Sequence, residues 1–369
     1  MADVQKIIGL MSGTSLDGVD AALVETDGED IAVPGPALGL PYDPEMRALL
    51  RQALDDAQTV AAGAPVPYSI RDAERRLTEA HADAVKALLA KAGLHARQVA
   101  LIGFHGQTIL HRPAQRWTWQ IGDGALLARL TGIDVVNDFR SADVKAGGQG
   151  APLVPLYHAA LVRKAGHYDL PVVLVNIGGV ANVTYIGRDG VLAFDTGPGN
   201  APIDDWMHRH SGRPVDENGD FARTGKVDAA ALNKMLANTF FDAVPPKSLD
   251  RLDFGTGAVE GLSPQDGAAT LTAFTAASIA KAREHFADTP NAWIVMGGGR
   301  HNRTLMDSLR ARVNAPVLAA EDAGWNGDFI EAEAFAYLAA RSVKGLPLSL
   351  PTTTGVKAPM TGGKLHGAP

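Results

Sequence analysis

Cysteine is absent from all 369 residues of the sequence. Its absence excludes a disulfide framework, a thiol nucleophile and a cysteine-ligated metal, and it fits a reducing compartment, so we expect a cytoplasmic protein. Basic residues are also in short supply, with 34 Lys and Arg against 41 Asp and Glu and a net charge of −7. Because phosphate neutralisation needs a basic surface, this balance argues against nucleic acid as the main partner.

Long apolar runs are missing as well. The best membrane candidate, residues 170–187, contains two Asn, three Gly and a Pro and alternates like a strand. A membrane-spanning helix needs about 20 predominantly apolar residues, so we expect no membrane partner. The overall composition, 46% hydrophobic, is ordinary for a globular protein, and the length predicts two or three domains.

Glycine is abundant, with 40 residues that gather beside β-type apolar runs. Amphipathic patterns between these runs predict helices at 73–94, 268–286 and 330–343. Strands alternating with helices indicate an α/β protein, and strands ending in glycine turns bring backbone close to phosphates. The clusters are Met11–Gly18, Gly147–Gly150, Asn176–Gly179, Gly197–Gly199 and Gly297–Gly299.

Two segments, 6–24 and 172–186, share one pattern of strand, glycine turn and strand. Two hairpins of one design about half a chain apart suggest a duplicated domain, although glycine hairpins are common. We place the first domain at residues 1–130 together with the C-terminal tail at about 346–369, and the second at 131–345.

The first glycine turn combines backbone N–H groups, hydroxyls and the Asp17 carboxylate. Successive N–H groups form a nest for an anion, and Asp17 would hold Mg²⁺, while an ordinary hairpin turn is the alternative. The second turn, Asn176–Gly179, follows the same logic of backbone N–H groups beside glycine. At the triple glycine a flat ring or a phosphate can lie against backbone, and Asn302 is placed to cap a helix that starts near Thr304. Three such elements favour a nucleotide. The predicted cofactor-binding residues are Ser12, Gly13, Thr14, Ser15, Leu16, Asp17, Gly18, Asn176, Gly178, Gly179, Gly297, Gly298, Gly299 and Asn302.

These hairpins and the triple glycine resemble the phosphate and adenosine motifs of the acetate and sugar kinase/Hsp70/actin superfamily. The sequence also contains more specific motifs, which are GLMSGTSLDGVDAAL, GFHGQTILHRP, QIGDGALLA, DFRSADVKAGGQGAPLVPLYH, NIGGVANVT, FDTGPGNAPID, MGGGRHNRTLM, EAEAFAYLA and TTTGVKAPMTGG. On these motifs it is similar to the anhydro-N-acetylmuramic acid kinase family over nearly its whole length. At one position it departs from the wider superfamily, since Met11 stands where an Asp is usual, which leaves the metal ligands open.

The resemblance implies two RNase H-like α/β domains of the actin/hexokinase/Hsp70 type, with an active-site cleft between them. It implies ATP and Mg²⁺ as cofactors and a homodimer as the assembly. The implied reaction opens 1,6-anhydro-N-acetylmuramic acid with water and phosphorylates its O6. The products would be N-acetylmuramic acid 6-phosphate and ADP, in the recycling of cell-wall sugars.

Two carboxylates are the catalytic candidates. Asp195 follows an expected strand at 191–194, where a carboxylate is placed for general-base work, although Asp is also a common turn former. The resemblance places Asp195 on the family's catalytic aspartate, which would activate the attacking water. It also makes Glu331 a supporting carboxylate, while a glutamate that favours the helix dipole is the alternative.

Polar residues near strand ends and loops are the candidate sugar contacts. His105 and Gln107 follow an apolar run at 99–103 and are expected at a strand end. Arg140 suits the lactyl carboxylate of muramic acid, because a guanidinium binds a carboxylate bidentately, and an exposed ion pair with Asp138 is the alternative. The predicted substrate-binding set is His105, Gln107, Asp123, Asp138, Arg140 and Gln149.

Two rival functions stay open. One is a kinase of the same fold that acts on another N-acetylated hexose, with Asp195 deprotonating its hydroxyl. The other is an ATP-driven binding module of the Hsp70 type, which would need a long substrate-binding extension. We expect the roughly 70 residues after the triple glycine to be too few for such an extension.

Overall fold

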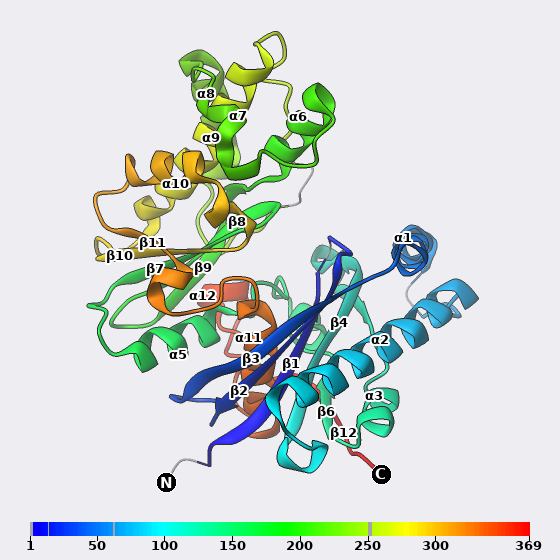
Figure 1. The fold of residues 1–369 in the computed structure, drawn as a ribbon. Coiled ribbons are helices and arrows are strands. Elements are labelled where there is room, and N and C mark those ends of the chain that lie inside the picture. Colours follow the sequence, from blue (N-terminus) through cyan, green and yellow to red (C-terminus); the bar gives the residue numbers. More distant parts are fainter. Residues whose placement is uncertain (1–2, 14, 62, 250–252) are drawn as a thin grey trace. The chain divides into compact units, whose positions relative to one another are not determined.

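The computed structural model describes residues 3–13, 15–61, 63–249 and 253–369 (Figure 1). The chain forms two compact units, one made of residues 1–166 and 329–369 and the other of residues 167–328. Each unit is built on its own β-sheet with helices packed against it, which confirms the α/β class.

The first unit contains a seven-stranded sheet in the order β12-β6-β4-β1-β2-β3, with β5 paired to β4. β1 runs antiparallel to β2 and parallel to β4. Its strands are β1 Gln5–Ser12, β2 Gly18–Thr26, β3 Ala32–Pro41, β4 Leu101–Arg112, β5 Trp117–Ile121, β6 Val135–Asn137 and β12 Lys364–His366. Its helices are α1 Pro44–Thr59, α2 Tyr68–Ala92, α3 Gly124–Thr131, α4 Ser141–Lys145, α5 Pro155–Ala165, α11 Ile330–Val343 and α12 Pro351–Thr354.

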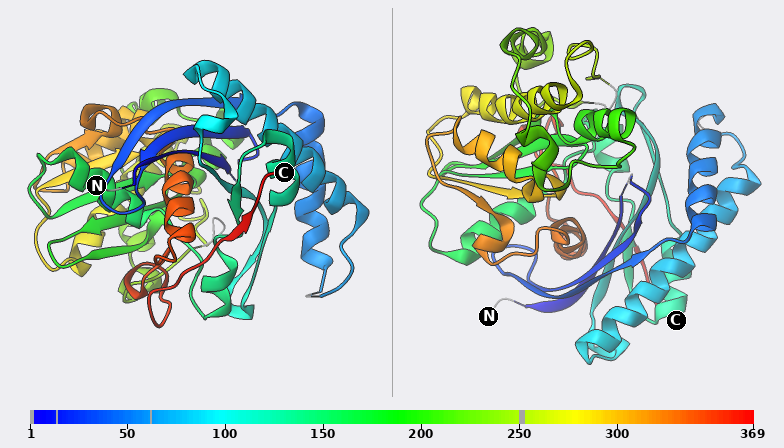
Figure 2. Two further views of the ribbon diagram at one scale, coloured as in Figure 1. Left: turned by 90° about the horizontal axis from the view of Figure 1, so that it is seen from below. Right: turned by 45° about the horizontal axis from the view of Figure 1, so that its top comes forward.

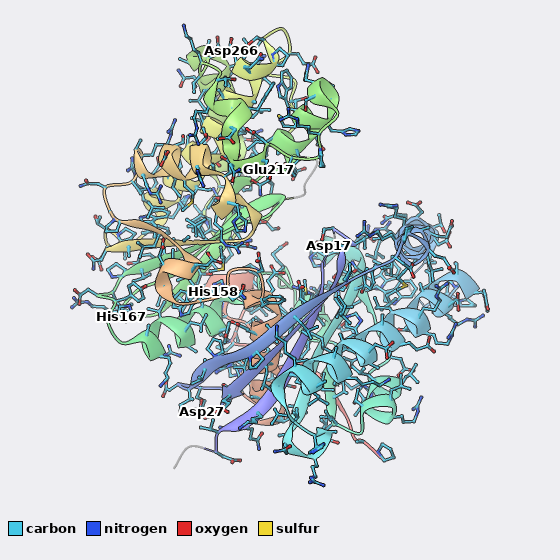
Figure 3. All side chains as sticks on the ribbon, in the orientation of Figure 1. Asp17, Asp27, His158, His167, Glu217 and Asp266 are labelled. Atoms are coloured by element: carbon cyan, nitrogen blue, oxygen red, sulfur yellow. The ribbon has the colours of Figure 1, made fainter. Side chains whose placement is uncertain are left out.

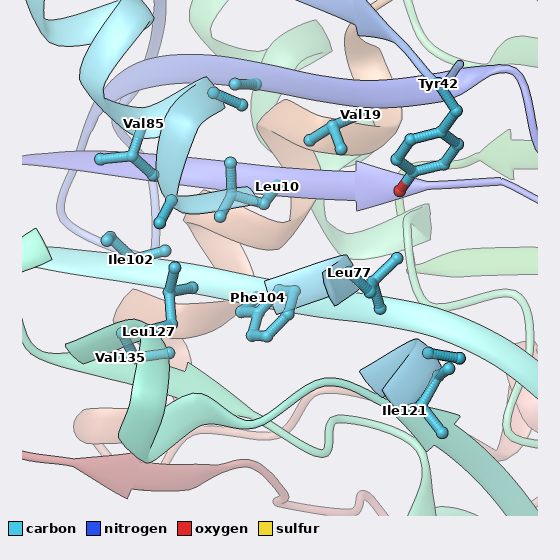
Figure 4. Close-up of a cluster of buried hydrophobic side chains, with 14 of the residues drawn as sticks. Leu10, Val19, Tyr42, Leu77, Val85, Ile102, Phe104, Ile121, Leu127 and Val135 are labelled. Carbon is cyan, nitrogen blue, oxygen red and sulfur yellow. The ribbon is translucent and has the colours of Figure 1, made fainter. Parts of the chain in front are cut away.

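One face of this sheet is covered by α1 and α2. Leu10 on β1 and Phe104 on β4 are fully buried there in one cluster with Leu77 and Val85 of α2 (Figure 4). Burial of such side chains stabilises the fold by roughly 1.5–3 kcal/mol each. The cluster fixes the inner strands, and it therefore fixes the turn that follows β1.

The opposite face of the same sheet is covered by α11 (Figure 2). Gly9 and Gly103 lie side by side on β1 and β4 and touch the helix backbone. A Cβ on Gly9 would lie 1.8 Å from the carbonyl oxygen of Ala332, and one on Gly103 would lie 2.0 Å from that of Phe335. The absence of a side chain on these two residues lets α11 lie directly on the sheet.

The second unit contains a five-stranded sheet in the order β11-β10-β7-β8-β9. Helices α9 and α10 pack on its apolar residues, and a separate apolar cluster joins α6, α7, α8 and α9. Its strands are β7 Val172–Ile177, β8 Val180–Ile186, β9 Val191–Pro198, β10 Ala292–Met296 and β11 Val317–Ala319. Its helices are α6 Ala201–Ser211, α7 Asp220–Arg223, α8 Ala229–Leu236, α9 Pro264–Lys281 and α10 Arg303–Arg310.

The two units begin and end at residues other than the predicted domain boundaries. Residues 131–166 and 329–345, which we expected in the second domain, belong to the first unit. The reason is strand pairing and helix packing, since β6 pairs with β4 and β12 while α11 packs on β1.

Local predictions agree with the structure in most places. The helix expected at 330–343 is α11, and the two predicted hairpins are β1–β2 and β7–β8. Two placements differ: Asp195 lies inside β9 rather than after a strand, and His105 lies inside β4 because that strand continues to pair with β5. Throughout the described ranges, no helix is both long and apolar enough to cross a membrane.

We predict that Gly9→Ala lowers the free energy of unfolding by about 1–3 kcal/mol or more, because the added methyl group overlaps the backbone of α11. Chemical denaturation of the purified variant measures this change. Gly367→Ala is the matched control, since a Cβ there meets nothing within 4 Å. Equal denaturation midpoints for the two variants would contradict the close contact.

Candidate active site

Three glycine clusters of the second unit lie against one another. The turn between β7 and β8 pairs through its backbone with the segment that leads into α6. The N–H of Asn200 donates to the carbonyl of Gly178 at 2.7 Å, and the N–H of Gly199 donates to that of Gly179 at 2.9 Å. The triple glycine joins them, because Gly297 approaches the side chain of Asn176. The structure thus brings together the predicted residues of two separate sequence motifs.

The glycines in this group differ in what surrounds them. A Cβ on Gly297 would lie 2.4 Å from Oδ1 of Asn176, and one on Gly299 would lie 2.3 Å from Cγ2 of Ile177, so these two serve packing. The nearest atoms to a Cβ on Gly178, Gly179 and Gly298 lie farther away, at 3.6, 3.7 and 3.8 Å respectively. The N–H of Gly178 already donates to the carbonyl of Val180 at 3.2 Å, so anion binding by backbone N–H groups would fall to Gly179 and Gly298.

A buried arginine holds the triple glycine in place. Arg300 donates from Nη1 to the carbonyl of Gly297 at 3.0 Å. It also forms ion pairs with Glu321 at 2.9 Å and Asp328 at 2.8 Å. Asn302 caps α10 as expected, since its Oδ1 accepts the N–H of Leu305 at 2.9 Å. The side-chain oxygen of Asn302 therefore stabilises the N-terminus of α10.

The turn after β1 in the first unit is built around a buried hydroxyl. Ser12 Oγ donates to Oε1 of Gln107 at 2.7 Å and shares a hydrogen bond with the Tyr42 hydroxyl at 2.9 Å. The predicted cofactor residue Ser12 and the predicted sugar residue Gln107 are thus bonded to each other. Leu16 closes the turn in the left-handed region, with φ of 55°. The predicted residue Thr14 lies outside the described residues.

Asp17 is the candidate magnesium ligand. It lies exposed at the end of the β1–β2 hairpin (Figure 3). Its Oδ1 accepts the Ser15 hydroxyl at 2.8 Å, while Oδ2 receives no hydrogen bond from a described residue. A hard carboxylate oxygen open to solvent fits a hydrated Mg²⁺, which usually keeps several waters. Among the described residues, no three His, Asp or Glu side chains come together as a metal site.

Arg140 and His105 form a linked pair near α11. Arg140 Nε donates to Nε2 of His105 at 2.9 Å, and Nη1 donates to the carbonyl of Gly150 at 2.7 Å. Because Nε2 accepts, Nδ1 of His105 carries the proton and donates to the carbonyl of Gly106 at 2.8 Å. The Phe335 ring lies 4.6 Å from the His105 ring and 5.9 Å from the guanidinium carbon. Arg140 Nη2 makes no hydrogen bond to any described residue, so it is available to a ligand.

Desolvation sets the charges of this pair and of Glu331. Burial lowers the pKa of His105 well below its usual value, and the charge of Arg140 lowers that pKa further. Burial lowers the pKa of Arg140 to about 10, against the attraction of Glu331 and Asp143. Glu331 is exposed, yet desolvation by the surrounding protein raises its pKa, and Arg140 opposes that shift. At neutral pH the group therefore presents a charged guanidinium supported by a neutral imidazole.

Two predicted sugar contacts lie elsewhere in the first unit. Asp123 caps α3, with its Oδ1 accepting the N–H of Leu126 at 2.9 Å. Asp138 is exposed in the left-handed region, with φ of 57°, and lines a polar pocket with Asp123. Arg140 donates to His105 and Gly150 rather than to Asp138. The alternative of an exposed ion pair between Arg140 and Asp138 is therefore wrong. The backbone N–H of Gln149 donates to the carbonyl of Thr354 at 2.7 Å.

Asp195 is a half-buried carboxylate on β9. Its Oδ2 accepts the N–H of Leu249 at 2.8 Å, and Oδ1 has no hydrogen-bond partner among the described residues. Burial raises the pKa of Asp195 to about 7, although the Leu249 N–H favours the charged form. A carboxyl group with this pKa can both accept and release a proton near neutral pH.

The sequence did not predict a role for Lys247, because the residue lies in a polar loop where a lysine is usually solvated. Its Nζ donates to the carbonyls of Phe240 at 3.0 Å and Phe241 at 3.3 Å. Its carbonyl accepts the N–H of Asp195 at 3.0 Å. Lys247 thus ties the loop that carries Leu249 to the catalytic candidate. The sequence signal for Lys247 is the pair of phenylalanines that precedes it, because a cation can lie over an aromatic ring, as Nζ of Lys247 lies 4.7 Å from the centre of the Phe240 ring.

Comparison with known proteins decides the family. A family model described as anhydro-N-acetylmuramic acid kinase matches residues 5–367. The chain belongs to this family. Its relatives include the anhydro-N-acetylmuramic acid kinase of Rhizorhabdus wittichii, 55% identical over 361 residues, or 97% of this chain and 98% of the relative. That of Paramagnetospirillum magneticum is 54% identical over 363 residues, or 97% of this chain and 99% of the relative.

A solved structure supports the fold. Component A of (R)-2-hydroxyglutaryl-CoA dehydratase from Acidaminococcus fermentans is similar with a TM-score of 0.50 and 12% sequence identity. The similarity covers 92% of this chain and 99% of that chain. At this identity the likeness concerns the fold alone, and it agrees with the fold class predicted for the family.

We predict that alanine affects stability differently at two neighbouring glycines of the second unit. Gly299→Ala should lower the free energy of unfolding by about 1–3 kcal/mol, because its methyl group meets Ile177. Gly298→Ala should change it by less than about 0.5 kcal/mol, because the added carbon meets only Nδ2 of Asn200, at an ordinary contact distance of 3.8 Å. Thermal denaturation of both variants checks this. Equal losses of stability would show that Gly298 is also a packing residue.

Proposed function

We propose that the protein is an ATP-dependent kinase that opens 1,6-anhydro-N-acetylmuramic acid and phosphorylates its O6. The products are N-acetylmuramic acid 6-phosphate and ADP. Membership of the anhydro-N-acetylmuramic acid kinase family over residues 5–367 supports the kinase activity. The observation that carries the hydrolytic part is Asp195, whose burial raises its pKa to about 7 and whose Oδ1 has no hydrogen-bond partner among the residues that the structure describes.

In this proposal Asp195 is the general base. Its Oδ1 takes a proton from water as the water oxygen bonds to C1 of the sugar and the C1–O6 bond breaks. O6 bonds to the γ-phosphorus of ATP, and the bond to the β–γ bridging oxygen breaks to release ADP. The Leu249 N–H holds Oδ2 and so orients the carboxylate towards the water. The O6 leaving group needs no separate acid, because phosphorus captures it.

Phosphoryl transfer asks mainly for positioning and for stabilisation of charge. The loops at Gly178, Gly179 and Gly298 would bind the nucleotide, together with the turn that follows β1, with the N–H groups of Gly179 and Gly298 as donors. Asp17 would hold Mg²⁺, which neutralises phosphate charge when it is bound.

Arg140 is the proposed anchor of the sugar. Its Nη2 and the second proton of Nη1 would bind the lactyl carboxylate, while His105 and Gly150 fix the guanidinium. Glu331 is the proposed supporting carboxylate, on the same helix as Phe335. Gln107, Asp123, Asp138 and Gln149 stay predicted sugar contacts, and the homodimer and the cytoplasmic location stay predictions.

An ADP-release assay separates this function from its nearest rival. With ATP and Mg²⁺, we expect ADP and a phosphorylated sugar from 1,6-anhydro-N-acetylmuramic acid. N-acetylmuramic acid, which lacks the bridge, should give less than about one hundredth of that rate, because no C1–O6 bond activates its O6. Equal rates with both sugars would instead indicate an ordinary hexose kinase with Asp195 as base for the hydroxyl.

The pH dependence of kcat/KM should follow Asp195. Because its pKa is raised to about 7, the base form gains population as pH rises, so kcat/KM should climb through an apparent pKa near 7 and level off above it. Asp195→Asn should lower kcat by about 10²–10⁴-fold while ATP still binds, as calorimetry can measure. Asp189→Asn, at an exposed aspartate of the same unit, is the control. Full turnover by Asp195→Asn would remove Asp195 from the mechanism.

A further inference from the structure

A buried carboxylate in α4 ties together three segments of the first unit. Asp143 is 1% exposed, and its Oδ1 accepts the N–H of Gly150 at 2.6 Å. Its Oδ2 accepts the hydroxyl of Thr354 at 2.6 Å and also the hydroxyl of Ser349. Ser349 and Thr354 lie just before and at the end of α12, so the C-terminal segment is fastened to this carboxylate. The side chain accepts from three donors, as a buried polar group requires.

The same carboxylate fixes the loop that holds Arg140. Gly150 donates its N–H to Asp143, and its carbonyl accepts Arg140 Nη1 at 2.7 Å. The preceding N–H, of Gln149, donates to the carbonyl of Thr354 at 2.7 Å. The loop is therefore held from α4 and from the C-terminal segment at once. Gly148 allows the close approach, because a Cβ there would lie 2.1 Å from Asp143 Oδ1.

A continuous chain of contacts thus leads from the C-terminal segment to the guanidinium. It runs from Thr354 through Asp143 and Gly150 to Arg140, and from there to His105. Asp143 also contributes charge, since its attraction opposes the lowering of the Arg140 pKa by burial. Neither the resemblance motifs nor the general-base chemistry assigns a task to this carboxylate.

We propose that Asp143 is a positioning residue that sets the affinity for the acidic sugar by fixing Gly150 and, through it, the guanidinium of Arg140. The C-terminal segment 349–354 holds Asp143 in place through the hydroxyls of Ser349 and Thr354. The inference rests on the proposed role of Arg140 as the anchor of a substrate carboxylate. A small displacement of such an anchor is costly, because a misplacement of about 1 Å can change a rate by about 100-fold.

The test compares two substitutions of one hydroxyl. Thr354→Val keeps the shape of the side chain but removes the donor, whereas Thr354→Ser keeps the donor. We expect Thr354→Val, and likewise Asp143→Asn, to raise KM for 1,6-anhydro-N-acetylmuramic acid about tenfold or more, with KM for ATP changed less than twofold. Thr354→Ser should restore the KM of the wild type. Ser349→Ala gives an independent removal of the second hydroxyl, with the same expected direction.

Thermal midpoints are measured alongside, so that a purely structural role is visible. A fall in midpoint with KM for the sugar unchanged in Thr354→Val and Ser349→Ala would overturn the proposal, because the carboxylate would then only stabilise the fold. A parallel rise of both KM values would overturn it too, since the effect would not be confined to the sugar.

Arg140→Gln separates failure of this inference from failure of the proposed function. If wild-type protein is active and Arg140→Gln raises KM for the sugar while Thr354→Val does not, the role of Asp143 fails and the function stands. If wild-type protein releases no ADP with the sugar, the proposed function fails and the role of Asp143 fails with it.

Discussion

The contact of α11 with bare backbone at Gly9 and Gly103 is the constraint on which the first unit depends. It places the helix directly on β1 and β4, and the helix in turn places Phe335 against His105 and Arg140. Burial beneath that ring keeps the imidazole neutral, so that it accepts from the guanidinium instead of repelling it. The close packing of α11 on the sheet therefore also determines the electrostatics of the site. It leaves the Arg140 guanidinium positively charged and positioned to bind an anion.

The second unit uses glycine in two distinct ways. At Gly297 and Gly299 the missing side chain allows the chain to pack on Asn176 and Ile177, whereas at Gly298 it leaves backbone accessible. Arg300 stabilises this arrangement by donating to the carbonyl of Gly297 and by forming two ion pairs, with Glu321 and Asp328. The same unit carries Asp195, whose pKa is raised by burial. The neighbouring loop is held by Lys247, which donates to the carbonyl of Phe240. Rigid support of polar groups is what catalysis by positioning demands.

Local sequence patterns predicted what local interactions determine. Helix 330–343 follows from apolar periodicity, and the cap at Asn302 from its own side chain. The pattern failed where distant pairing decides: β9 continues past Asp195 because Gly197 pairs with Ala181, against the usual breaking effect of glycine. The domain boundaries depend on equally distant pairing. Asp143 escaped notice for the same reason, since its hydroxyl partners come from the C-terminal segment.

The most direct test of the coupled reaction follows the oxygen of water. The protein is given 1,6-anhydro-N-acetylmuramic acid, ATP and Mg²⁺ in ¹⁸O-labelled water, and the product is reduced at once and analysed by mass spectrometry. A parallel incubation of the finished product in labelled water measures anomeric exchange. We expect one ¹⁸O at C1 and none in the phosphate. Label in the phosphate, or phosphorylated sugar without label at C1, would contradict the coupled reaction.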